Sequence, residues 1–421
     1  MRIPMRILAI LLFAAAFAPP VFAAKRVSVE RLEQFLTETR GMPDAKLARQ
    51  ISDLELTERL SETKLQHWYS ELSGQMSGQA LIALADASAF LNPPTAEMPA
   101  KAEPDLASQT QMMTMVLNYV NQTIHQLPNF FATRDTISFE DTPSTPSTFT
   151  SGQATGLSPI PPTDESGGEH RYEPLHAVSD SSATVLYRDG NEVVDTGDRK
   201  DKESEPQVQG LATSGEFGLE LGIVIVDAIH GKLAWSHWEQ SVAGPWAVFH
   251  YSVPQGASHY SVMYSDSAGD VRQVPAYHGE IAVDPASGAV WRLTVVAELK
   301  PTDLTSVSNR MVEYGPVAIG GTTYVCPMKA VALSKVELTT VMGRFRKRLG
   351  MQQTKLNDIS FTQYHLFRAE TRVLTGDSEE PAGSPPASGG TSVLASPQTQ
   401  TPSATDSHPH PPDQRPPQRL R

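Results

Sequence analysis

The stretch HGEIAVDPASGAVWRLTVVAEL, residues 278–299, decides the fold more than any other part of this sequence. It consists of two apolar runs, 278–283 and 289–299, on either side of Asp284-Pro285-Ala286-Ser287-Gly288. Proline after the first turn residue and glycine at the end fit a type I turn with a bulge. The stretch is therefore predicted to be a β-hairpin, and the sheet around it to be antiparallel.

Short apolar runs bounded by Gly, Pro or Ser continue on both sides of this hairpin, from residue 169 to residue 374. One helix is expected among them, over 215–229. The whole segment reads as roughly nine to eleven antiparallel strands plus this helix. Two further hairpins are predicted where tight-turn residues separate neighbouring runs: 183–188 with 192–195, and 309–319 with 322–333.

Residues 24–140 have the apolar spacing of helices instead. Ser28 is a suitable N-cap for the first helix, and Gly41 a suitable end. A longer helix is expected from about 106 to 126. We predict an α+β protein in which this N-terminal helical domain precedes a curved, mainly antiparallel, half-barrel-like β domain, 169–374.

The first 23 residues have the pattern of a secretory signal peptide. Arg2 and Arg6 precede an apolar run, and small residues then lead to a cleavage site between Ala23 and Ala24. The run is shorter than the ~20 residues that a membrane-spanning helix needs, and a retained anchor is the alternative. A periplasmic or secreted location is expected, with no transmembrane segment after signal removal.

Two stretches have the composition of disordered chain, because they are rich in Pro, Ser and Thr and poor in aromatic residues. Residues 141–168 are interpreted as a linker and residues 375–421 as a flexible tail.

Composition excludes several functions. The net charge of −13 argues against a protein that wraps nucleic acid through a basic surface. A single cysteine, Cys326, excludes an internal disulfide framework and any site built from several Cys ligands. Cys326 is expected to be a buried strand residue, and an intermolecular disulfide is the alternative.

Motifs that would carry catalysis are missing: the sequence contains no nucleophile elbow, phosphate-binding loop or His-Glu-x-x-His motif. His237 and His250 would be the first histidines to consider for acid–base work, although their spacing supports no motif. Glu220 and Asp227 fall in the helix expected over 215–229 and have no recognisable partner. We therefore expect a non-catalytic protein without a metal or other cofactor.

Aromatic residues on the expected strands give the best candidates for ligand contact. On a curved sheet they would line a concave apolar surface for a lipid, an acyl chain or a glycan. An ordinary aromatic core between sheet and helix is the alternative. The candidates are Trp235, Trp238, Trp246, Tyr251, Tyr260 and Trp291.

Several short sequence segments resemble those of a family of exported bacterial proteins of unknown function. They are residues 56–61, 84–91 and 127–134, together with 279–285 and 314–317. This resemblance covers most of the chain outside the signal, linker and tail, and it implies no catalytic residues.

The run of strands with an Asp-Pro-x-x-Gly turn is also similar to the outer-membrane lipoprotein carrier and sorting superfamily. That likeness implies an open half-barrel whose apolar concave face is covered by helices. The leading expectation is thus a binding protein for a lipid or another apolar envelope ligand. The alternatives are an envelope scaffold that binds a protein partner through the helical domain, and an extracellular polymer hydrolase.

Overall fold

The computed structural model describes residues 24–143, 172–195, 215–241, 244–266, 269–342 and 345–367. All of these residues belong to one compact unit. The predicted signal with Ala23, most of the predicted linker and the predicted tail lie outside the described residues.

Four short helices form the first part of the chain. Ser28 caps the first helix, accepting a hydrogen bond from the Arg31 N–H at 3.3 Å, and Gly41 follows that helix with φ +84°. The Asp44 carboxylate accepts hydrogen bonds from the N–H groups of Met76 and Ser77, which satisfies the open end of α5. The elements are β1 (Lys25–Val27), α2 (Val29–Glu38), α3 (Asp44–Ser52), β2 (Leu54–Leu56), α4 (Glu62–Glu71) and α5 (Gln75–Ala87).

The long helix α6 (Leu106–Gln126) has the predicted bounds, and the Asp105 side chain caps it by accepting from the Ser108 N–H at 2.8 Å. The next element, β3 (Phe130–Thr142), is a strand of the large sheet. The sequence interpretation placed residues 130–140 in the helical domain. In the structure they lie between strands from the second half of the chain.

Ten strands form one antiparallel sheet in the order β5-β4-β3-β14-β13-β12-β11-β10-β7-β6. The described part of this sheet is not closed into a barrel. Together with the helices, it confirms the broad prediction of an α+β protein with a large antiparallel sheet. Its remaining strands are β4 (Glu173–Arg188), β5 (Asn191–Asp195), β6 (Lys232–Ser241), β7 (Gly244–Val253), β10 (Tyr277–Val283), β11 (Val290–Ala297), β12 (Thr305–Ile319), β13 (Thr322–Met342) and β14 (Phe345–Leu366). A separate hairpin is formed by β8 (Val262–Asp266) and β9 (Gly269–Gln273).

All three predicted hairpins are present. Asp189 and Gly190 turn with φ +52° and +81°, and Gly320 and Gly321 turn with φ +61° and +89°. These left-handed values are those of two-residue hairpin turns. The predicted helix over 215–229 is α7 (Leu219–His230), shorter at its start than expected.

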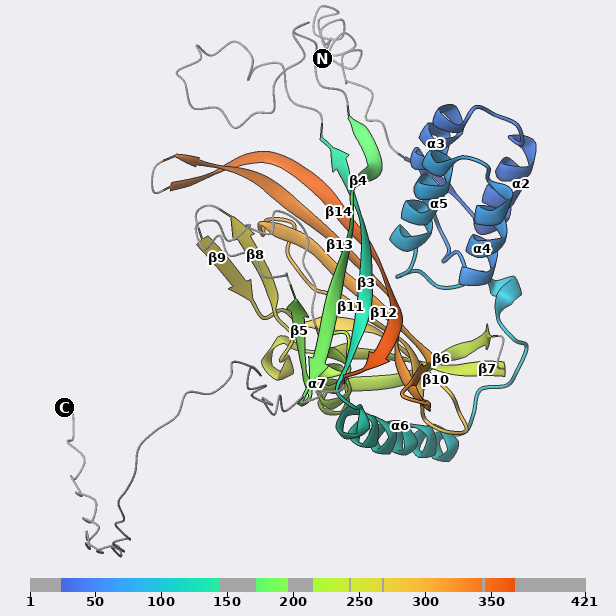
Figure 1. Cartoon of the computed structure of the whole chain (residues 1–421), viewed down its shortest axis with the longest axis vertical. Coiled ribbons are helices and arrows are strands. Elements are labelled where there is room, and N and C mark those ends of the chain that lie inside the picture. Colours follow the sequence, from blue (N-terminus) through green and yellow to red (C-terminus); the bar gives the residue numbers. More distant parts are fainter. Residues whose placement is uncertain are drawn as a thin grey trace, which may run out of the picture. The chain divides into compact units, whose positions relative to one another are not determined.

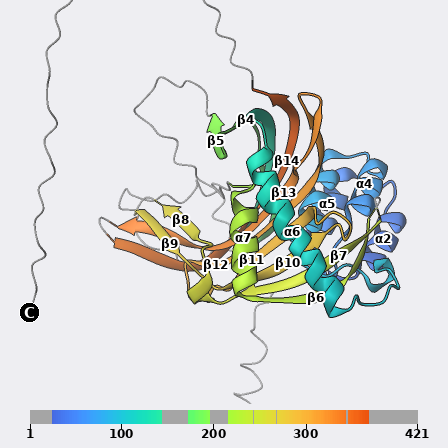
Figure 2. The same ribbon diagram turned by 90° about the horizontal axis from the view of Figure 1, so that it is seen from below.

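The two faces of the sheet are covered by different helices (Figures 1 and 2). On one face, α6 and α7 pack over a core that includes Phe130, Tyr251 and Ile281. On the other face, α5 packs through Ala83 against Phe139 and Leu356. We call these the α6–α7 face and the α5 face. Six α-helices lie in the described ranges, two on the first face and α2–α5 with the second.

Candidate functional site

The structure distributes the six predicted aromatic residues over both faces of the sheet. Four belong to the core of the α6–α7 face: Trp235, Trp238, Tyr251 and Tyr260. Trp246 lies opposite Glu239 across β7 and β6 and stacks on Trp291, with ring centroids 6.3 Å apart. Glu239 faces the helical part of the chain, so this pair belongs to the α5 face. The six residues do not surround one common cavity.

The four residues on the α6–α7 face are packed into the core, and the side chains of Tyr251 and Trp238 are also hydrogen-bonded. Tyr251 is fully buried, and its hydroxyl donates to the Thr294 carbonyl at 2.7 Å. Trp238 packs edge-on against Trp235 and donates from Nε1 to the Ala102 carbonyl at 2.8 Å. These four residues therefore form part of an aromatic core beneath α6 and α7.

A narrow crevice lies between the C-terminal half of α6 and the start of α7. Its volume is about 20 Å³, and its lining is mostly apolar. Residues on both helices and on the strands below contribute: Tyr119, Leu127, Phe217, Leu221, Tyr314 and Val325 among them. Cys326 follows Val325 on β13; it is fully buried, as predicted, and burial raises the pKa of its thiol to about 12.

Five charged side chains meet at the start of α7, on the α6–α7 face. They come from five segments of the chain: Arg134 on β3, Glu192 on β5, Glu216 before α7, Glu220 in its first turn and Arg310 on β12. We call them the α7 ion cluster. The sequence analysis noted Glu220 without a partner, and the fold supplies one.

Arg310 is the centre of this cluster. Its Nη2 lies 2.9 Å from Oε1 of Glu216 and 3.1 Å from Oε2 of Glu220. Arg134 Nη2 lies 3.9 Å from the same Glu216 oxygen. Glu192 accepts a hydrogen bond from the Gly215 N–H at 2.9 Å, so it holds the chain just before α7.

Burial raises the pKa of two carboxyls in this cluster, those of Glu192 and Glu220. Glu216 and Glu220 are 0% and 4% exposed. Burial and the nearby Glu216 raise the pKa of Glu192 to about 7. Burial also raises the pKa of Glu220 to about 7, although Arg310 opposes that shift. Charged residues with raised pKa values inside an apolar core are candidates for a functional role.

Asp227, the second unpartnered acid of the sequence analysis, fixes the other end of α7. Its carboxylate is buried and accepts hydrogen bonds from the Tyr277 hydroxyl at 2.8 Å and from the His259 N–H at 2.8 Å. His259 Nδ1 also lies 2.6 Å from it, while the imidazole is 73% exposed. These bonds tie α7 to β10 and to the segment before β8.

On the α5 face, buried charges connect the helical part of the chain to the sheet. The Arg292 guanidinium donates to both carboxylate oxygens of Glu239 at 2.6 Å, and Arg59 Nη2 lies 2.6 Å from the same carboxylate. Lys329 Nζ lies 2.8 Å from Asp86 on α5. Burial disfavours the charged form of Glu239, but Arg292, His237 and Arg59 together outweigh burial and hold the pKa of Glu239 well below its usual range.

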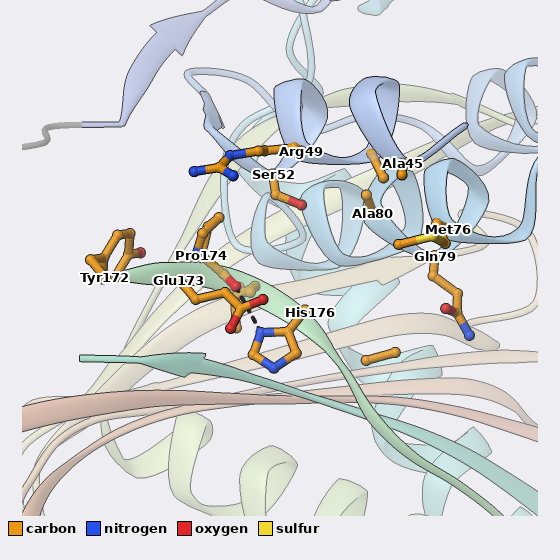
Figure 3. Close-up of a pocket in the computed structure, with 13 residues that line it drawn as sticks. Ala45, Arg49, Ser52, Met76, Gln79, Ala80, Tyr172, Glu173, Pro174 and His176 are labelled. Carbon is orange, nitrogen blue, oxygen red and sulfur yellow. Dashed lines mark hydrogen bonds between the residues drawn. The ribbon is translucent and has the colours of Figure 1, made fainter. Parts of the chain in front are cut away.

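A larger cavity, about 590 Å³, lies between α3, α5 and the start of β4. Figure 3 shows Arg49 and Ser52 on the helical side and Glu173 and His176 on the strand side. The apolar part of the lining includes Ala48, Ala80 and Leu175. The sequence offered no signal for this cavity, because the start of β4 is far along the chain from α3 and α5.

The two histidines considered for acid–base work, His237 and His250, have different neighbours. His237 Nε2 is 3.7 Å from Glu239, and the His250 ring lies 5.9 Å from that of His278. Within the described ranges, no group of three or more His, Cys, Asp or Glu side chains is placed to hold a metal ion.

The fold and these sites describe an α+β protein with an open antiparallel sheet, one face of which lies under two helices. No protein-family model, curated protein or solved structure matches the chain. None of the helices in the described part of the chain is long and apolar enough to cross a membrane.

Proposed function

We propose that this chain is an exported, non-catalytic binding protein that holds the apolar chain of an envelope amphiphile against the α6–α7 face. The observation that supports this most directly is the crevice between the end of α6 and the start of α7, which is lined by Leu127, Phe217 and Leu221 and adjoins the apolar core of the α6–α7 face. In this proposal the signal peptide directs the protein to the periplasm or the cell exterior.

The sheet would act as a half-barrel, with α6 and α7 as its cover. Its α6–α7 face presents apolar side chains from every strand between β3 and β7, such as Phe130, Val312 and Phe249. An apolar chain inserted there would leave water at a gain of roughly 25 cal/mol per Å². Trp235 and Trp238 would be among its contacts.

The crevice in its present form is smaller than a ligand. Pockets for small molecules typically measure about 300–1,000 Å³, against about 20 Å³ here. Binding therefore requires α6 and α7 to separate, so that the incoming chain replaces contacts that the helices now make with the sheet. The α7 ion cluster, next to Phe217 at the crevice, would supply polar partners for a head group.

Brominated acyl chains test this proposal, because bromine quenches only those tryptophans that it approaches closely. We expect the full mature chain, mixed with a brominated phospholipid, to lose fluorescence from Trp235 and Trp238. The double variant Trp235→Phe/Trp238→Phe should lose most of the quenching.

The matched control is Trp246→Phe/Trp291→Phe, which removes the stacked pair on the α5 face. It should leave the quenching intact. Absence of quenching, or quenching carried by Trp246 and Trp291, would contradict an acyl site under α6 and α7.

A second candidate is an envelope scaffold that binds a protein partner through its helical part. The cavity between α3, α5 and β4 favours it, since its volume of about 590 Å³ is within the range of a binding pocket and its lining mixes apolar with polar residues. In this case Ala48→Trp, which fills the cavity, should reduce recovery of one defined partner from envelope extracts. Glu38→Gln, an exposed change on α2, should not.

A further inference from the structure

The helix α7 is apolar on its outer side as well as on the side that packs against the sheet. Its two charged residues, Glu220 and Asp227, are both buried. Three of its apolar side chains are exposed instead: Leu219 at 70%, Val226 at 51% and Ile229 at 47%. A helix that is apolar all round is normally covered on every side, whereas the described part of the chain leaves these three in contact with solvent.

These exposed residues belong to one row along the helix. Leu219, Gly222, Ile223 and Val226 recur at the i, i+3, i+4 and i+7 spacing, and Ile229 continues the row by another turn. Gly222 and Ile223 are half-buried. We call these five residues the α7 outer stripe. Their spacing is that of a ridge along which a second helix can pack.

The neighbouring helix adds surface that carries no charge. None of the 21 residues of α6 is Asp, Glu, Lys or Arg, although 19% of the whole chain is charged. The helices α6 and α7 lie side by side on the outer side of the α6–α7 face (Figure 2). Depletion of charged residues is typical of the centre of a protein interface. The exposed side chains of α6 include Thr110, Gln111, Thr114, Asn118, Asn121 and Gln122.

Several polar groups of this surface are already paired within their own helix. The Thr110 hydroxyl donates to the Leu106 carbonyl at 2.8 Å, and the Thr114 hydroxyl donates to the Thr110 carbonyl at 2.9 Å. At the end of α7, His230 Nδ1 lies 2.8 Å from the Val226 carbonyl oxygen. Groups that are paired inside a helix stay paired when a partner covers them, so their burial costs little free energy.

We propose that a second copy of this chain covers the uncharged surface of α6 and α7, with the α7 outer stripe packed against its own copy across a two-fold axis. The net charge of −13 favours this occupant, because two acidic chains repel each other least where both surfaces are uncharged. Helices that bind membranes usually carry Lys or Arg beside their apolar face, and neither α6 nor α7 contains one.

The size of this surface suits a reversible dimer. At 1.5 Å per residue, α6 is about 31 Å long and α7 about 18 Å, and with a width of about 10 Å each they project to about 500 Å². Side-chain relief raises the accessible area above this projection. A standard interface removes about 800 Å² per partner, so we expect a dissociation constant in the micromolar range. The dimer does not rest on the proposed ligand site, and its test needs no lipid.

Sedimentation velocity of the full mature chain tests the dimer. We expect monomer to convert to dimer as the concentration rises through the micromolar range. Val226→Glu places two like charges near the two-fold axis and should weaken the dimer at least about a hundredfold. Val178→Glu is the matched control, because Val178 is 47% exposed and follows the part of β4 that borders α3 and α5. It should leave the dissociation constant unchanged.

Ionic strength gives an independent measurement on the unchanged protein. Salt screens the repulsion between two acidic chains, so the dissociation constant should fall as salt is added. A dissociation constant that rises with salt would mean that charged residues elsewhere make the contact, and it would overturn the proposal.

A cysteine in the stripe locates the contact. Val226→Cys should form an intermolecular disulfide under mild oxidation, whereas Val178→Cys should not. Cys326 does not compete, because it is fully buried. If Val226→Glu fails to fold, the two cysteine variants decide between the outcomes.

Three results would overturn the dimer: a monomer throughout the micromolar range, a dimer that Val226→Glu leaves intact, or equal disulfide formation by both cysteine variants. Flotation of the monomer with vesicles of neutral phospholipid would also overturn it, since a bilayer would then be the occupant of this surface.

Discussion

Glu239 shows how a single buried side chain connects two parts of the chain. It accepts from Arg292 on β11 and lies beside Arg59 from the helical segment. Both arginines are buried, at 7% and 3% exposure for Arg59 and Arg292. Removing their common partner would leave two guanidiniums close together without the carboxylate that both contact, and only the more distant Glu280 and Glu313 would offset their charge.

Glu239→Gln should therefore destabilise the protein by about 3–5 kcal/mol, the usual cost of breaking a buried ion pair. Urea unfolding measures this. Glu71→Gln is the matched control, because the ion pair of Glu71 with Arg40 is exposed and worth about 0–1 kcal/mol. Equal losses in the two variants would mean that the buried network contributes no more than a surface pair.

Glu239 also sets the acid side of the stability profile. Its pKa is lowered in the folded protein, so its contribution is present above the ordinary value and is lost as pH falls below it. The raised pKa values of Glu192 and Glu220 act in the opposite sense, at higher pH. The protein should therefore be most stable between the pH at which Glu239 gains its proton and the pH at which Glu192 and Glu220 lose theirs.

At the scale of elements, the turn from Asp284 to Gly288 is where hairpin and helix meet. The Asp284 carboxylate accepts from the Ala286 N–H, and the Gly288 N–H donates to the Asp284 carbonyl. A Cβ on Gly288 would lie 2.5 Å from the Met115 carbonyl carbon of α6. The glycine thus serves both the turn, with φ +75°, and the close approach of the helix.

Gly288→Ala should cost more than Gly321→Ala. Both positions have left-handed φ, for which alanine costs about 1–2 kcal/mol, but no atom lies within 4 Å of a Cβ at Gly321. The difference in unfolding free energy between the two variants isolates the contact with α6. Equal costs would show that α6 moves away without loss.

The elements that sequence could predict are those with strong local signals. The hairpins at Gly190, Gly288 and Gly321 were predicted from turn residues, and α6 from its apolar spacing. The expected last strand began at residue 357, whereas β14 begins at Phe345. The first half of β14 is polar, and within the sheet residues 345–353 pair with β13 alone. Its sequence therefore lacks the alternation of apolar and polar residues that would have predicted a strand.

At the scale of the whole molecule, one sheet serves two separate layers of helices. The α5 face is joined to the helical segment by ion pairs such as Lys329 with Asp86, and the α6–α7 face by apolar packing and the α7 ion cluster. A scaffold role would use the first layer and a binding role the second. The two proposed functions thus concern different faces of the same sheet.

Local sequence patterns account for the hairpins, the helix positions, the burial of Cys326 and the aromatic content of the strands. These follow from turn chemistry and apolar periodicity, which act over a few residues. Which residues meet depends instead on the fold of the whole chain. It placed β3 beside β14, divided the six aromatic candidates between two faces, and brought Glu192, Glu216 and Glu220 to Arg134 and Arg310. Such contacts join residues up to about 230 positions apart, and no local pattern encodes them because burial on a shared face depends on the order of strands in the sheet.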